Sequence, residues 1–221
     1  MNRKLLLLII LIVLSFIVFP AKAHRLRLVY SQDLNPDSPF LIAEPQIAQN
    51  FYGELKSSPD YYQINLAEPL NLHFSLLSPA NREERQDFAA EIISNNYDSP
   101  ELSLFSLASE DPLWDVYFEK FAGDKYYQGP EASVDLEPGS YFLKVYSPDN
   151  KGKYTLMLGQ EESFSSQDII DSLEKLPVLK KEFFAAPPIA AYFNLIGLFA
   201  SLVIASAIVF AFWLASIFFR K

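Results

Sequence analysis

An uncharged segment near the carboxyl end constrains this chain more than any other feature. No residue from Ile189 to Phe219 carries an ionisable charge, and Leu195 to Phe219 alone is long enough to cross a hydrocarbon layer of about 30 Å. Tyr192 and Trp213 lie near the two ends of this stretch, as membrane interfaces favour. We therefore predict one transmembrane helix over 189–219, followed by a cytoplasmic tail over 220–221.

The amino end has the pattern of a secretory signal. Two basic residues precede the apolar run from Leu5 to Phe19, and small residues in segment 21–23 have the spacing of a cleavage site. We predict a signal peptide over 1–23 and a mature chain that begins at His24; an uncleaved signal anchor is the alternative. This topology places the bulk of the chain outside the cell membrane and its carboxyl end in the cytoplasm.

Charge is concentrated between the two apolar ends. Residues 24–187 hold all 27 acidic and 13 of the 18 basic residues, which gives this part a net charge of −14. Such a surface repels phosphate backbones and argues against nucleic-acid binding, whereas divalent cations or basic partners are favoured. The chain has no cysteine, which excludes disulfides, thiol catalysis and zinc–thiolate sites.

Apolar and polar residues alternate in several stretches of the middle segment, as in half-buried strands. These stretches are 70–76, 88–92, 102–105, 141–146 and 154–158. A turn pattern over 148–152 predicts a hairpin between the last two, with Tyr141 and Tyr154 facing one core. Short strands without helical periods between them predict a mainly β fold, an antiparallel β-sandwich over 46–160 behind a polar leader over 24–45.

Three motifs within this segment carry a family resemblance. Asp60-Tyr61-Tyr62 begins one strand, Pro138-Gly139-Ser140-Tyr141 leads to Val145 in a second, and Gly152-Lys153-Tyr154-Thr155-Leu156 forms a third. Together they resemble the bacterial pre-peptidase C-terminal domain, and the resemblance spans residues 46–159. It implies a small jelly-roll-like β-sandwich of the kind appended to secreted enzymes, without catalytic residues of its own.

The segment 161–188 connects the sandwich to the membrane helix. Ser165 and Asp168 have the spacing of a capping box, which predicts a short juxtamembrane helix, and Pro177 is expected to end it. A flexible stalk is the alternative interpretation of this segment.

A cluster of aromatic residues offers the best candidate for a binding surface. It consists of Trp114, Tyr117, Phe118, Phe121, Tyr126 and Tyr127. Exposed rings stack on sugar faces or anchor a protein partner, and turns at Gly123 and Gly129 place part of this segment in loops. The alternative is that these rings fill the sandwich core.

Two further sets of residues have suggestive spacing. Asp33, Asn35, Asp37 and Glu44 match the ligand positions of an EF-hand loop, but a serine replaces the turn glycine; the alternative is a polar leader without a cofactor. Gly197, Ser201 and Ala205 recur on one face of the predicted transmembrane helix. Small residues at this spacing favour pairing of two helices and therefore a homodimer.

These features favour a membrane-anchored extracytoplasmic binding module that is not an enzyme. Its expected contacts are membrane lipid and an envelope protein or a glycan. One alternative is a structural or accessory subunit of an envelope membrane complex, docked through its helix. Another is a carbohydrate-active enzyme, a glycosidase, because acidic residues are abundant. A serine hydrolase built on His73 has no accompanying nucleophile motif.

Overall fold

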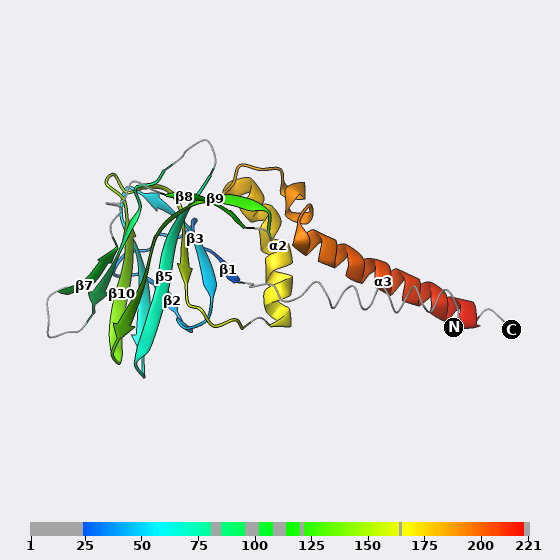
Figure 1. Cartoon of the computed structure of the whole chain (residues 1–221), viewed down its shortest axis with the longest axis horizontal. Helices are drawn as coiled ribbons and strands as arrows, with labels where there is room; N and C mark the ends of the chain where they lie inside the picture. Colours follow the sequence, from blue (N-terminus) through cyan, green and yellow to red (C-terminus); the bar gives the residue numbers. More distant parts are fainter. Residues whose placement is uncertain are drawn as a thin grey trace.

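The computed structural model describes residues 24–80, 85–95, 102–107, 114–119, 122–163 and 165–218. A two-layered β-sandwich forms the body of the molecule (Figure 1). Helix α2 (Ser166–Glu182) lies beside it, and helix α3 (Leu195–Phe218) leads away as a rod. The predicted signal peptide and cytoplasmic tail lie outside the described residues.

Each layer of the sandwich is one sheet. The strands of the first are β1 (Arg25–Leu28), β3 (Gln49–Lys56), β11 (Lys151–Leu158), β5 (Leu70–Pro79), β9 (Asp124–Leu136) and β8 (Asp115–Glu119), in this spatial order. The strands of the second are β2 (Phe40–Ile42), β4 (Asp60–Leu66), β10 (Gly139–Tyr146), β6 (Ala89–Ser94) and β7 (Leu102–Leu107), also in spatial order. Neighbours pair antiparallel, except that β1–β3 and β2–β4 are parallel. The predicted mainly β sandwich is confirmed.

The main core lies between the two sheets. Tyr141 on β10 and Tyr154 on β11 both belong to it, as predicted. However, β10 pairs with β4 and β6, whereas β11 pairs with β3 and β5. The turn over 148–152 therefore crosses from one sheet to the other, and the predicted hairpin is wrong. Turn residues and alternation indicate a reversal of the chain, but they do not reveal which sheet receives the next strand.

The predicted polar leader over 24–45 is wrong as well, because it contributes an outer strand to each sheet. Arg25 on β1 is in register with Gln49, and Phe40 on β2 is in register with Tyr62. Both pairings are parallel and join residues that are distant in the chain. Strands this short have too few alternating positions to be recognised without their partners.

Helix α2 begins at the predicted capping box. The Ser165 hydroxyl accepts the Asp168 N–H at 3.1 Å, and the Asp168 carboxylate accepts the Ser165 N–H at 2.8 Å. The helix then continues through Pro177 to Glu182, so the predicted end at the proline is wrong. Leu179 and Phe183, which follow the proline, are fully buried. Their burial offsets the hydrogen bond that the proline cannot make.

A second apolar cluster holds α2 against the outer face of the first sheet, so the segment is not a flexible stalk. Its buried members are Tyr52, Leu77 and Tyr126 from the sheet, Leu176, Leu179 and Phe183 from α2 and its end, and Ala191 beyond it. Alternation explains the arrangement: on β3, Phe51 faces the main core while its neighbour Tyr52 faces α2.

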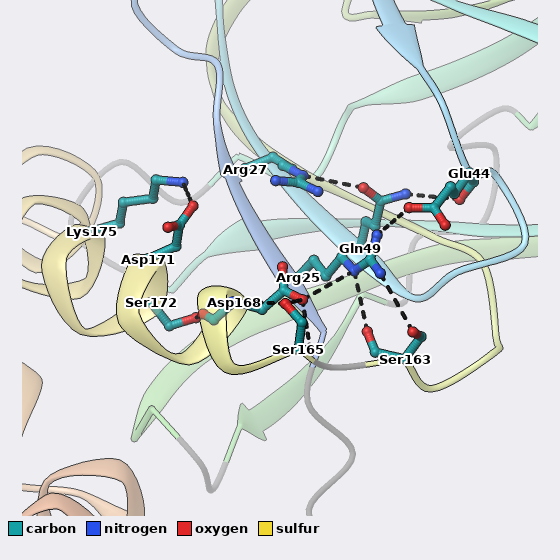
Figure 2. A network of polar contacts seen from close by, with 10 residues as sticks. All are labelled: Arg25, Arg27, Glu44, Gln49, Ser163, Ser165, Asp168, Asp171, Ser172 and Lys175. Carbon is teal, nitrogen blue, oxygen red and sulfur yellow. Dashed lines mark hydrogen bonds and ion pairs between the residues drawn. The ribbon is translucent and has the colours of Figure 1, made fainter.

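Polar contacts hold the amino-terminal end of α2 to β1 (Figure 2). The Arg25 guanidinium forms an ion pair with Glu44, lies 3.5 Å from the Asp168 carboxylate and donates a 3.2 Å hydrogen bond to the Ser163 carbonyl. The capping box therefore has a tertiary partner in addition to its local bonds.

The structure confirms that the carboxyl-terminal segment forms a helix, since α3 lies within the predicted range 189–219. Within the residues that the structure describes, no helix is both long and apolar enough to cross a membrane.

Candidate interaction surface

The structure divides the predicted aromatic cluster among three environments. Trp114 is buried in the main core, 6.4 Å from the Phe88 ring centroid, and Gly129 lies under its indole. Tyr126 is buried beneath α2, and Tyr127 is partly buried against the main core. Phe121 lies outside the described residues. These rings do not form one surface, because successive residues of a strand point to opposite faces.

Among the described members of that cluster, Tyr117 and Phe118 alone are exposed, and both belong to β8. Their exposed fractions are 38% and 48%, and that of the neighbouring Val116 is 68%. Val116 was missed because a lone valine has no distinctive pattern. A recognisable signal exists in Asp115 to Glu119, where three consecutive apolar residues stand between two carboxylates instead of alternating.

The position of β8 explains this exposure. It is the last strand of the first sheet and pairs with β9 through Val116–Tyr127 and Tyr117–Tyr126. No described strand pairs with its other side. An edge strand presents backbone N–H and C=O groups that can pair with another chain, and natural proteins usually protect such edges. Among the described strands, this edge therefore has no partner on its outer side, and it carries exposed apolar side chains.

Tyr117 shows how the two faces of β8 differ. Its ring lies 6.3 Å from that of Tyr126 and extends the apolar surface beneath α2. Partial burial, with a smaller effect of Glu119, raises the pKa of the Tyr117 hydroxyl. Val116 and Phe118, one position away on either side, project toward the opposite face of the strand.

A shallow depression of about 250 Å³ is a second candidate site. It is lined by Ser31, Gln32, Asp33, Glu54, Lys56, Ser58 and Asp60. Asp60 is 6% exposed and accepts a 2.6 Å hydrogen bond from the Tyr154 hydroxyl, which lies 2.7 Å from that of Tyr62. Burial raises the pKa of Asp60 to about 6, although the Tyr154 bond and the Lys56 charge lower it in part. This network joins the two sheets within the fold.

The predicted calcium ligands do not converge. Asn35 accepts hydrogen bonds from the backbone N–H groups of Asp37 and Ser38 in a local turn, and Glu44 pairs with Arg25. Among the described residues no group of three acidic or histidine side chains is arranged to hold a metal ion.

His73 lies on β5, in register with Ser133 on β9. Its Nδ1 is 3.0 Å from the Ser133 hydroxyl, in an exposed position. The described residues place no carboxylate in hydrogen-bond contact with the ring to orient it, as a catalytic triad requires. We interpret this contact as a cross-strand pair.

The small residues predicted for helix pairing have contacts within the chain. Gly197 is buried, and a Cβ atom there would lie 1.8 Å from the Tyr192 carbonyl oxygen. The Ser201 hydroxyl donates to the Gly197 carbonyl at 2.7 Å, and Ala205 is half-buried. Gly197 therefore has a role in starting α3, and pairing of two helices stays a prediction.

No family model matches the sequence, and no curated protein is similar enough to match it. Among solved structures, the pre-peptidase C-terminal domain of a collagenase from Bacillus anthracis matches 57% of this chain and 98% of that chain, with 19% identity and a TM-score of 0.34. The Yersinia pseudotuberculosis-derived mitogen matches 55% of this chain and 92% of that chain, with 10% identity and a TM-score of 0.33. Likenesses this weak carry no argument about function, and the β-sandwich is established by the two sheets themselves.

Proposed function

We propose that this protein is a membrane-anchored extracytoplasmic interaction module whose β8 edge binds an extended, basic segment of a partner protein. The observation that carries the proposal is the exposed edge strand with Val116, Tyr117 and Phe118 on its two faces. A partner strand that pairs with the outer side of β8 would extend the first sheet by backbone hydrogen bonds and cover these side chains.

The charges beside the edge favour a basic partner. Asp115 and Glu119 flank the three apolar residues, and Asp115 is exposed. The segment 24–187 has a net charge of −14, so a basic strand would also be attracted at a distance. A glycan is a weaker fit, because the predicted stacking rings Trp114 and Tyr126 are buried.

The carboxyl-terminal segment supports the anchoring part of the proposal. Helix α3 exposes large apolar side chains, with exposed fractions of 59% for Ile204 and 73% for Phe212. Phe193, just before the helix, is 81% exposed. Such surfaces are unfavourable in water and favourable in lipid. The whole uncharged segment 189–219, which extends beyond the described residues, is the membrane anchor in this proposal.

A photo-crosslinking residue at position 116 tests the edge directly. The matched control is the same residue at position 41 on β2, another edge strand, where Leu41 is 56% exposed. In native membranes we expect position 116, and not position 41, to crosslink one protein at a basic, extended segment. A synthetic peptide of that segment should bind the full chain, and Phe118→Asp should weaken this binding at least tenfold. Crosslinks to lipid or glycan alone, or equal crosslinking at both positions, would refute the proposal.

An accessory subunit of a membrane complex is the second candidate, favoured by the exposed apolar side chains of α3. Deletion of residues 195–221 distinguishes the two functions. If the partner is bound through β8, the crosslink at position 116 persists after the deletion. If α3 is the docking element, the partner is lost from detergent extracts while the sandwich remains folded.

A further inference from the structure

Three elements meet at the backbone carbonyl of Ala122, in the turn between β8 and β9. The Lys180 ammonium from α2 donates to this oxygen at 2.6 Å. The Asn194 amide, from the residue just before α3, donates to it at 2.8 Å. One turn of the sandwich is therefore bonded both to the helix that covers it and to the start of the helix that leads away.

Lys180 is also half of a buried ion pair. Its side chain is 3% exposed and lies 2.5 Å from the Asp124 carboxylate, which is 5% exposed. The ammonium lies 5.6 Å from the ring centroid of Phe184. The second Asp124 oxygen has no hydrogen-bond partner among the described residues, and burial raises the pKa of this carboxyl. Because desolvation often outweighs the attraction in such pairs, this one is better explained by the geometry it imposes than by stability.

Asn194 transmits this geometry to α3. Its amide nitrogen donates to the carbonyls of Ala122 and Ala191, and its side-chain oxygen accepts the Gly197 N–H at 3.0 Å, which caps the helix. The Tyr192 carbonyl approaches Gly197 so closely that no side chain fits there. The first turn of α3 is thus held by the Asn194 side chain and by the close approach of the Tyr192 carbonyl.

We propose that this junction, formed by Ala122, Asp124, Lys180 and Asn194, is a clamp that sets the direction in which α3 leaves the sandwich. Ala122 is also bonded to β8, since the carboxylate of Glu119 at the end of β8 accepts the Ala122 N–H at 2.6 Å. The clamp therefore holds the β8 edge at a set orientation to α3. The direction of α3 relative to the sandwich follows from these contacts alone. Only the further step, that this direction orients β8 relative to a membrane, rests on the proposed function.

Pulsed electron paramagnetic resonance on the full chain in detergent micelles tests the clamp. The chain has no cysteine, so Glu68→Cys on the sandwich and Ala207→Cys on α3, both at exposed positions, provide two unique spin-label sites. We expect one narrow distance distribution in the otherwise unchanged chain. Lys180→Met should broaden it at least twofold.

Two further variants make the result decisive. Asn194→Ala leaves the ion pair intact and should also broaden the distance distribution. It therefore tests the clamp even if Lys180→Met fails to fold. Lys175→Met breaks the ion pair with Asp171 on the same helix, 2.8 Å in length, and should leave the distribution narrow. A broad distribution in the unchanged chain, or unchanged width in Asn194→Ala, would overturn the clamp. No partner is present in this experiment, so failure of the β8 proposal would not affect it.

Discussion

Asp60→Asn should remove a large part of the pH dependence of stability between pH 4 and 7. Asp60 is 6% exposed, and burial raises the pKa of its carboxyl from 3.8 to about 6. The folded protein therefore binds this proton more tightly than the unfolded chain does. The resulting contribution to stability is complete below about pH 4 and is lost as the pH rises through about 6.

The magnitude follows from the two pKa values. A difference of about two units, at about 1.4 kcal/mol for each unit, corresponds to about 3 kcal/mol of unfolding free energy. Asparagine has the same shape and remains neutral, and its side-chain oxygen can still accept the Tyr154 hydroxyl. The variant should therefore keep the Asp60 position packed while losing its titration.

Urea unfolding of the full chain in detergent, followed by fluorescence of the buried Trp114, measures this effect at a series of pH values. The unfolding free energy of the unchanged protein minus that of the variant should fall by about 3 kcal/mol as the pH rises from 4 to 7. Asp135→Asn is the matched control, since this carboxylate is exposed and accepts a 2.7 Å hydrogen bond from Asn71. If Asp60→Asn retains the full pH dependence of the unchanged protein, the assignment of the raised pKa to this carboxyl is refuted.

Three other substitutions test the packing. Gly53→Ala should cost about 3 kcal/mol and lower the Tm, because the new Cβ would lie 2.3 Å from the Tyr154 ring; an unchanged Tm would contradict the close approach. Leu179→Ala, at a fully buried position on the face of α2 that packs on the sheet, should cost about 2–5 kcal/mol of unfolding free energy in urea. Val178→Ala, at a position of α2 that is 44% exposed, should cost far less; equal costs would mean that α2 is not docked. Ala185→Gly should raise stability by about 0.5–1 kcal/mol, because Ala185 has φ +52°, and calorimetry that shows a loss would contradict the strain.

Local patterns predicted those elements whose evidence lies in neighbouring residues. The strand over 70–76 follows from alternation, since one face of a sheet is buried. The capping box at Ser165 and Asp168 located the start of α2, because its hydrogen bonds join residues three positions apart. The end of α2 was mispredicted at Pro177, because the packing that carries the helix past the proline comes from a distant sheet.

Sequence alone thus determined that this chain has an acidic, cysteine-free, mainly β middle part and an uncharged carboxyl-terminal helix. Only the tertiary structure decided which aromatic rings are buried, because the faces of β8 and β9 depend on what packs against them. It also decided that Lys180, Asp124 and Asn194 meet at one turn. Long-range contacts of this kind leave no periodic trace in a single sequence, since the residues that form them are separated by dozens of positions.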